Sequence, residues 1–313
     1  DRKPLSPAAF GAGGEILFGG ASLYVLDSSL RLLTQFTPSA IASGGGLGVP
    51  VPLGTGSIAF ATATLPDGGL PSALLGLSYD TAGNGAQLVR IDFDTPVTTQ
   101  TQAALGQTPQ SGWPNVYVGA RANLFGFDTS PTAQAPLLFS VPLSADAVPD
   151  PTLTPSTHVW NDGLADHIHL LVPTVGLGLF DPTGTPAQGW PAPIVPNGTS
   201  ALFQVMPDGT AIAADGSDTL RAFDPQGTEL WSWSASAPGY DDETLIGLTL
   251  GAGSTLYVTT SRAVYALDAP AAGPVTQLWS WSSQWNALVT GAALSATQVF
   301  VLTEDGRLHA IPR

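Results

Sequence analysis

The stretch Thr219-Leu-Arg-Ala-Phe-Asp224-Pro-Gln-Gly-Thr-Glu-Leu-Trp231 holds the pattern that decides the fold. It contains a short β-rich run that ends in Asp, a turn with Gly, and a second β-rich run. Runs of the first kind recur at residues 22–27, 88–92, 123–128, 176–181 and 263–268, and one at 307–312 has Pro in the Asp position. Short β-rich runs joined by Gly, Asp and Asn favour antiparallel hairpins, so the sequence predicts β-structure throughout.

The spacing of these runs predicts the architecture. From Asp181 to Asp224, Asp268 and Pro312 the steps are 43, 44 and 44 residues, and another β-rich run precedes most copies. The first half is less regular, with insertions expected around residues 42–52 and 66–71. Four short strands in roughly 43 residues, repeated seven times, are typical of a propeller. We therefore predict an all-β, seven-bladed β-propeller of four-stranded antiparallel blades, forming one domain over residues 1–313.

The last repeat stops directly after its third strand, at Arg313. An open strand edge exposes unpaired backbone groups, so another segment has to cover it. We expect residues 1–4, or residues removed upstream of them, to pair beside residues 307–312.

The composition of the chain argues against certain partners and excludes certain kinds of chemistry. The chain has 24 acidic and 9 basic residues, a net charge of -15, and no cysteine. The negative charge repels phosphate backbones, so no nucleic-acid partner is expected, and thiolate and Cys-based zinc chemistry are excluded. Richness in Thr, Ser, Ala, Gly and Pro with a single lysine is typical of an exported protein. We expect a periplasmic or cell-envelope location, with a membrane tether through a removed N-terminal segment.

The segment from Ala222 through Asp224 to Trp231 resembles the tryptophan-docking repeat of the quinoprotein (PQQ-repeat) propellers, and Ala266, Asp268 and Trp279 repeat it with a longer turn. The resemblance implies that Trp231 and Trp279 pack against the neighbouring blade. The family includes PQQ-dependent dehydrogenases and non-enzymatic propellers similar to the assembly lipoprotein BamB. The adjacent Cys pair of the dehydrogenases is absent, so the second kind is closer and PQQ is not expected. The Trp-Asp and Gly-His pairs of WD40 repeats are also absent.

Three of the four histidines, His158, His167 and His169, lie within twelve residues. His167 and His169 share one face of a predicted strand, and His158 lies on the preceding strand. Imidazoles that converge in this way suit Zn, Ni or Cu, and the alternative is a polar cross-strand cluster. Calcium is a weaker candidate, because the oxygen-rich segments 80–85 and 215–218 lack a complete ligand set. Residues 241–243, Asp-Asp-Glu, are expected in a solvated loop.

Four tryptophans lie in less regular segments near Pro, Gly or Asn, where exposed contacts are expected: Trp113, Trp160, Trp190 and Trp285. Trp113, Trp160 and Trp285 are the candidate anchors for a partner. Loops over residues 38–71, 129–136 and 146–157 are rich in Pro, Ala, Gly and Ser, and proline lowers the entropy that a loop loses on binding.

These features predict a non-enzymatic propeller that binds protein partners through a loop face. Two alternatives stay open. One is a small quinoprotein-like or metal-dependent enzyme with a site in a central channel, and the other is a module that binds glycans or small ligands. Scarce Lys and Arg and the lack of a nucleophile motif argue against the enzyme. The sequence does not identify the partner, a bound ion or the oligomeric state.

Overall fold

A computed structural model describes residues 8–11, 13–42, 44–53, 58–65, 72–80, 82–95, 97, 101–107, 115–129, 136–143, 155–190, 202–216, 218–235, 243–271, 273–282, 287–295 and 297–313. They fall into two compact units. Unit 1 comprises Asp1–Val172 and Phe180–Pro186, and unit 2 comprises Pro173–Leu179 and Ala187–Arg313. That residues 1–313 form one domain remains a prediction.

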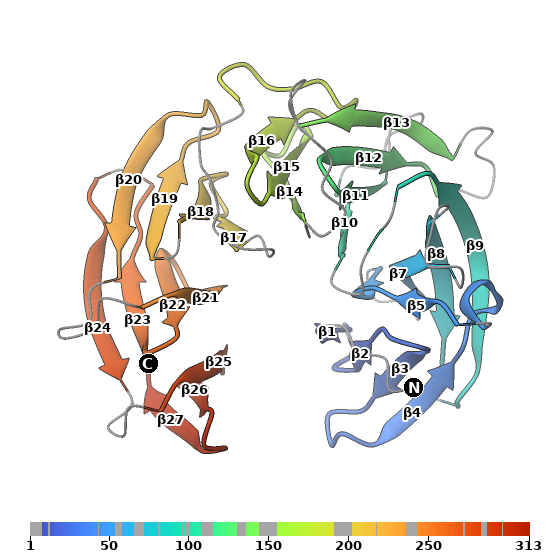
Figure 1. The fold of residues 1–313 in the computed structure, drawn as a ribbon, viewed down its shortest axis with the longest axis horizontal. Coiled ribbons are helices and arrows are strands. Elements are labelled where there is room, and N and C mark those ends of the chain that lie inside the picture. The colour runs from blue at the N-terminus through green and yellow to red at the C-terminus, as the bar shows by residue number, and fades with distance from the viewer. Residues whose placement is uncertain are drawn as a thin grey trace. The chain divides into compact units, whose positions relative to one another are not determined.

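In each of the first four sheets, the strands lie side by side in the order in which they occur along the chain (Figure 1). Sheet 1 has the order β1 (Ala9–Phe10), β2 (Ile16–Phe18), β3 (Leu23–Leu26) and β4 (Leu32–Phe36), followed by a short 3-10 helix, η1 (Ser39–Ile41). Sheet 2 has the order β5 (Gly46–Leu47), β7 (Ile58–Thr64), β8 (Ser72–Tyr79) and β9 (Gly85–Phe93), and β6 (Val51–Pro52) also pairs with β7. Sheet 3 consists of β10 (Ala103–Leu105), β11 (Val116–Ala120), β12 (Asn123–Phe127) and β13 (Leu137–Pro142), and sheet 4 of β14 (Ser156–Asn161), β15 (Asp166–Val172) and β16 (Gly176–Phe180).

The remaining three sheets repeat this plan. Sheet 5 consists of β17 (Phe203–Val205), β18 (Ala211–Asp215), β19 (Thr219–Phe223) and β20 (Glu229–Ser234). Sheet 6 consists of β21 (Leu245–Leu250), β22 (Thr255–Thr260), β23 (Ala263–Asp268) and β24 (Thr276–Ser282), and sheet 7 of β25 (Val289–Leu294), β26 (Gln298–Thr303) and β27 (Leu308–Pro312). Seven mostly four-stranded antiparallel sheets confirm the predicted all-β, seven-bladed propeller.

The Asp at the end of a third strand caps the turn that follows. Asp224 Oδ1 accepts hydrogen bonds from the backbone N–H of Gln226 at 2.9 Å and of Thr228 at 2.8 Å. Gly227 between them has φ of 80°, which favours glycine. Asp27 and Asp181 accept backbone N–H groups in the same way. A short acceptor side chain that satisfies two N–H groups explains why Asp recurs here.

One repeat was wrongly placed by the sequence pattern. Residues 88–92 belong to β9, the outer strand of sheet 2, and not to a third strand. The third strand is β8, and the residue that follows it is Asp80. Its carboxylate accepts hydrogen bonds from the N–H groups of Ala82 and Asn84 at 2.9 and 2.8 Å. The insertion expected at residues 42–52 contains the two short strands β5 and β6, which both pair with β7, and the one expected at 66–71 lies outside the described residues.

A cross-strand row of three residues lies near the Asp turn of five sheets, and we call it the docking row. Its middle member lies on the third strand and is Gly, Ala or, in sheet 1, Val. Its outer member, the docking residue, lies on the outer strand. A register shift follows the middle residue in all five rows. The rows are Leu17, Val25 and Thr34; Phe60, Gly76 and Val89; Tyr117, Gly126 and Phe139; Ile212, Ala222 and Trp231; and Tyr257, Ala266 and Trp279.

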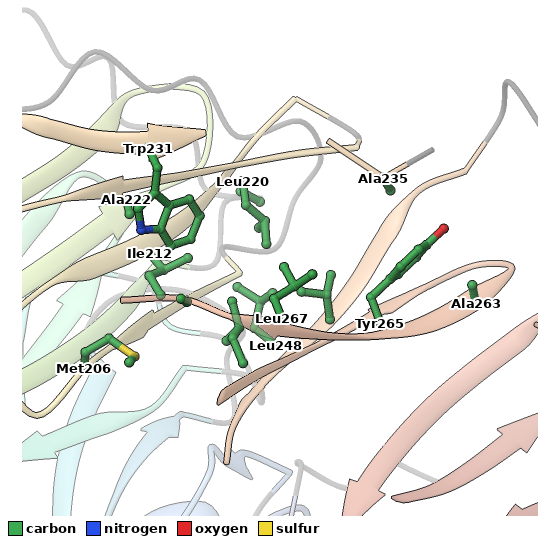
Figure 2. Packing of buried hydrophobic residues seen from close by; sticks show 14 residues of the cluster. Met206, Ile212, Leu220, Ala222, Trp231, Ala235, Leu248, Ala263, Tyr265 and Leu267 are labelled. Atoms are coloured by element: carbon green, nitrogen blue, oxygen red, sulfur yellow. The ribbon is translucent and has the colours of Figure 1, made fainter. Parts of the chain in front are cut away.

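Trp231 shows what a docking residue does. Its side chain is buried in a cluster that joins Ile212 and Ala222 of sheet 5 to Leu256 and Tyr265 of sheet 6, and Figure 2 shows the indole beside Ala222 and Ile212. The indole Nε1–H donates to the carbonyl oxygen of Pro270, which lies in the turn after Asp268, at 3.3 Å. The predicted packing of Trp231 against the neighbouring sheet is therefore confirmed.

Other docking residues reach the next Asp turn with different chemistry. In sheet 1, the Thr34 hydroxyl donates to the carbonyl oxygen of Asp80. In sheet 3, the Phe139 ring lies so close to Gly184, in the turn after Asp181, that a Cβ there would be 2.8 Å from the ring. An apolar or hydrogen-bonded contact thus links the outer strand of one sheet to the Asp turn of the following sheet.

Trp190 corrects the expectation of an exposed contact. It is buried, and its Nε1–H donates to the carbonyl oxygen of Pro225, which directly follows Asp224, at 3.1 Å. Gly189 and Gly227 pack backbone against backbone, because a Cβ on Gly227 would lie 2.7 Å from the Gly189 oxygen. Trp190 therefore makes the same contact with the next Asp turn as the docking residues do, although it lies on no strand.

The expected pairing of residues 1–4 with the last sheet lies outside the described residues. Within them, sheet 7 has three strands and sheet 1 begins at β1. The described residues contain no helix with the length and hydrophobicity to cross a membrane.

Candidate functional site

The predicted histidine and tryptophan residues meet on one hairpin, β14–β15. Its register pairs His158 with His169, Trp160 with His167 and Asn161 with Asp166. Alternate residues of a strand face opposite sides, so the three histidines and Trp160 share one face of the hairpin. Asn161 and Asp166 share the other face.

The tip of the hairpin is held by its own polar side chains. Asp162 Oδ1 accepts hydrogen bonds from the backbone N–H of Leu164 at 2.7 Å and of Ala165 at 2.9 Å. Asn161 Oδ1 accepts the N–H of Gly163, whose φ of 91° favours glycine. The hydrogen bond from Ala165, followed by those with His167 and from Leu164, lowers the pKa of Asp162 to about 2. The tip is therefore a well-defined turn at neutral pH.

The base of the hairpin is anchored on its other face. Asp166 is buried, and its two carboxylate oxygens accept hydrogen bonds from Asn161 Nδ2 at 2.8 Å and from the backbone N–H of Gln107 at 2.9 Å. Gln107 follows β10 of sheet 3, so this carboxylate connects the hairpin to the preceding sheet. A buried carboxylate satisfied in this way fixes the hairpin's position within unit 1.

The three imidazoles have different surroundings. His169 is fully buried, and burial, followed by the charges of His158 and His167, lowers its pKa to about 3. His158 opposite it is exposed. His167 directs Nε2 to Asp162 Oδ2 at 3.0 Å, and its ring lies 4.9 Å from that of Trp160, centroid to centroid. His167 thus supports the tip and the tryptophan.

This arrangement gives the predicted metal site no support. Among the residues that the structure describes, no group of three or more His, Cys, Asp or Glu side chains could hold a metal ion. Metal binding by His158, His167 and His169 stays a prediction. What the register shows is that His158 and His169 are direct cross-strand partners.

Trp160 is the predicted anchor that the structure describes. It is half-buried against His167, at the base of the turn whose tip presents Leu164, 82% exposed. Trp113 and Trp285 lie outside the described residues, and their role stays a prediction. Leu164 was not among the candidates, and its position two residues after Asp162 in a hairpin turn is the signal that marks it.

The acidic triple 241–243 contains a second departure from expectation. Asp241 and Asp242 lie outside the described residues, but Glu243 is buried at 4% exposure instead of solvated. Its carboxylate accepts hydrogen bonds from the Tyr265 hydroxyl at 2.9 Å and from the Thr260 hydroxyl. Burial, followed by the bond to Glu243, raises the pKa of Tyr265. The network ties the chain before β21 to the β22–β23 turn.

Neither a model of any known protein family nor any curated protein matches the sequence. Solved structures do resemble the chain. The C-terminal WD40 domain of Sif2 has a TM-score of 0.51 at 10% identity, covering 96% of this chain and 92% of that one. BBS1N in complex with ARL6DN gives TM-scores of 0.52 and 0.53 in two crystals, soaked with mercury and with lead. Identity is 14% and 12%, covering 96% and 98% of this chain and 88% and 91% of BBS1N. At these identities the likeness shows the fold, a seven-bladed β-propeller.

Proposed function

We propose that this protein is a non-enzymatic β-propeller scaffold that binds other proteins. The observation that carries the proposal is the likeness of nearly the whole chain to propeller domains, one of which was solved in complex with a protein, ARL6DN. The β14–β15 turn adds a candidate contact. It combines a rigid, hydrogen-bonded tip with an exposed leucine and a half-buried tryptophan, as partner anchors often do.

The location belongs to the same proposal. A single lysine and richness in Thr, Ser, Ala, Gly and Pro support an exported protein of the bacterial cell envelope. The docking of Trp190 and Trp231 supports the resemblance to BamB-like members of the PQQ-repeat propellers, because each indole reaches the next Asp turn. Fractionation of source cells tests the location, and recovery of the protein in the cytoplasm would contradict it.

The binding function is tested at the hairpin. Photo-crosslinking from position 164 in an envelope extract identifies the protein that contacts the tip, and titration with that purified protein measures its affinity. We expect Trp160→Ala with Leu164→Ala to weaken binding by about 30-fold, equivalent to about 2 kcal/mol. The matched control is Leu278→Ala, an exposed leucine on β24. Robust dye reduction with added PQQ and an alcohol or sugar would overturn the proposal in favour of a dehydrogenase.

A further inference from the structure

Unit 1 contains a pocket of about 800 Å³ beside the outer strand of sheet 2. This volume lies within the range of small-ligand sites. Leu88 and Leu53, which are 55% and 43% exposed, lie among the residues that line it. The full lining is Leu53, Ile58, Phe60, Gly76, Leu88, Val89, Arg90, Ile91, Asn115, Asp128, Thr129 and Pro136.

The pocket coincides with the docking position of sheet 2. Phe60, Gly76 and Val89, the docking row of this sheet, all line it. The facing wall includes Asp128 and Thr129, which begin the Asp turn of sheet 3. In sheets 1, 3 and 5 the docking residue reaches the Asp turn of the following sheet from this same position. The pocket therefore lies between a docking row and the turn that such a row contacts.

The residues of the row explain why a pocket forms here. In sheet 5 the middle and outer members are Ala222 and Trp231, and in sheet 3 they are Gly126 and Phe139. Sheet 2 has Gly76 and Val89 in these positions, so it combines the smallest middle residue with a short outer one. An aromatic ring fills the space in the other two sheets.

The walls suit an aromatic ring that carries an N–H group. Ile58, Phe60, Val89 and Ile91 supply apolar surface. Asn115 Oδ1 accepts hydrogen bonds from the N–H and the hydroxyl of Thr129, at 2.9 and 3.1 Å, which holds the polar wall in place. Asp128, whose carboxylate is a hydrogen-bond acceptor, lines the same wall. In sheet 5 the equivalent contact is an indole N–H donated to a carbonyl oxygen of the next turn. Tryptophan combines a large apolar body with such a donor.

The charge of the chain adds a preference for what flanks the ring. At the pocket itself the positive charge of Arg90 is paired with Asp92, at 2.7 Å, and the carboxylate of Asp128 also lines the wall. The net charge is -15, so a partner segment with lysine or arginine beside its aromatic residue is attracted at long range, and one with acidic flanks is repelled.

We propose that the pocket receives a tryptophan side chain from a basic segment of a partner protein, in the place where sheets 3 and 5 insert their own aromatic ring. This inference rests on the proposed scaffold function and assigns one contact to it. The partner's tryptophan would complete the docking row of sheet 2 from outside the chain.

The test uses the full chain and a peptide, Gly-Lys-Gly-Trp-Gly-Lys-Gly, with 5-fluorotryptophan so that ¹⁹F NMR reports the probe and not the eight native tryptophans. We expect saturable one-to-one binding, at least about 10-fold weaker with Glu in place of Lys, and none with Ala in place of Trp. NOEs from the bound indole should reach the methyl groups of Leu53, Ile58 and Leu88. No binding at millimolar peptide, or NOEs to other methyl groups, would overturn the proposal.

Val89→Trp supplies the ring from the chain itself. It should abolish peptide binding and raise Tm by about 2 °C, because the ring fills the pocket. Leu278→Trp, which adds a tryptophan on the exposed face of β24, is the matched control and should bind the peptide normally.

If Val89→Trp fails to fold, the NOEs of the wild-type complex still test the proposal. Peptide binding that appears only in Trp113→Ala would show that the chain's own Trp113 occupies the pocket, which overturns the proposal. A Val89→Trp chain that still binds its crosslinked partner fully would remove this contact and leave the scaffold function standing.

Discussion

Sheets 5 and 2 share the same strand pairing and register shift, but different side chains occupy the equivalent positions of their docking rows. In sheet 5, Ala222 leaves room for Trp231, which is buried and hydrogen-bonded to the next turn. In sheet 2, the same register shift and the same kind of row carry Gly76 and Val89, and a pocket of about 800 Å³ lies beside them. The backbone of a blade therefore does not decide whether its outer seam is filled. The side chains of the row decide it, the middle member together with the outer one.

We expect the two kinds of row to contribute differently, the filled row to stability and the row with a pocket to ligand binding. A filled row buries a large aromatic surface, so we expect it to contribute strongly to stability. A row with a pocket contributes less and leaves an apolar surface available to a ligand.

The largest expected effect is at Trp231. Trp231→Ala removes a buried indole that joins sheets 5 and 6, so it should lower the free energy of unfolding by about 3–5 kcal/mol. Val89→Ala, the matched change in sheet 2, should cost about 1 kcal/mol or less, because the pocket already reduces its packing. Urea denaturation of both variants measures the difference, and equal losses would contradict the comparison.

Sheet 4 carries three imidazoles on one face of its β14–β15 hairpin, and pH tests the effect of the buried one. The pKa of buried His169 is lowered to about 3, whereas an unfolded histidine titrates near 6.5. As the pH falls below 6.5, His169 becomes protonated in the unfolded state but stays neutral in the folded state, so the free energy of unfolding decreases. The contribution of His169 to the slope should approach about 1.4 kcal/mol per pH unit between pH 6 and 4.5.

Replacing the imidazole isolates its share of this slope. Urea denaturation at a series of pH values should show a smaller slope for His169→Leu than for wild type. His309→Gln, on β27, serves as the control histidine. A slope that His169→Leu leaves unchanged would show that His169 takes up its proton in the folded state.

Two glycines give the next contrast. Gly227→Ala places a Cβ 2.7 Å from the Gly189 oxygen at a φ of 80°, so it should cost about 2 kcal/mol or more. Gly76→Ala meets the Phe60 ring and the Val89 Cβ at 3.2 Å beside the pocket, into which the Phe60 ring has room to shift. We expect a change below about 1 kcal/mol for it. Thermal unfolding of the two variants measures both losses of stability. A larger loss for Gly76→Ala than for Gly227→Ala would show that the walls of the pocket are rigid.

The repeat was readable from the sequence where a blade keeps its length. The runs that end at Asp27, Asp128, Asp181, Asp224 and Asp268 are all third strands or their ends. Sheet 2 misled the pattern, because residues 88–92 alternate like a third strand and also end in Asp. Only the pairing of β8 with both β7 and β9 shows that Asp80 has the role of the capping residue.

The docking residues and the site were harder to predict from the sequence. The number of residues between an Asp and its tryptophan varies with the length of the turn between them. Trp190 follows Asp181 by nine residues and Trp231 follows Asp224 by seven, so the two did not align as one motif. The burial of Glu243 depends on Thr260 and Tyr265, which come from the next hairpin. The pocket arises where Gly76 and Val89 occur together in one row, which no motif marks. The histidines were found because they cluster in sequence, but their separate surroundings follow from the hairpin's register.

The smallest expected effect concerns sheet 1, which docks through a hydroxyl instead of a ring. Thr34 is buried, and it donates to the carbonyl oxygen of Asp80. Thr34→Val keeps the shape and removes the donor, which leaves that carbonyl without this bond and should cost about 1 kcal/mol. Thr276→Val, at an exposed position of β24, controls for the general effect of valine in a strand and should change stability by less than about 0.5 kcal/mol. Urea midpoints measure both, and amide hydrogen exchange of Asn84 should accelerate only in the Thr34 variant. Equal midpoints with unchanged exchange would mean that the hydroxyl contributes nothing, and that sheet 1 is held by the apolar members of its row, Leu17 and Val25.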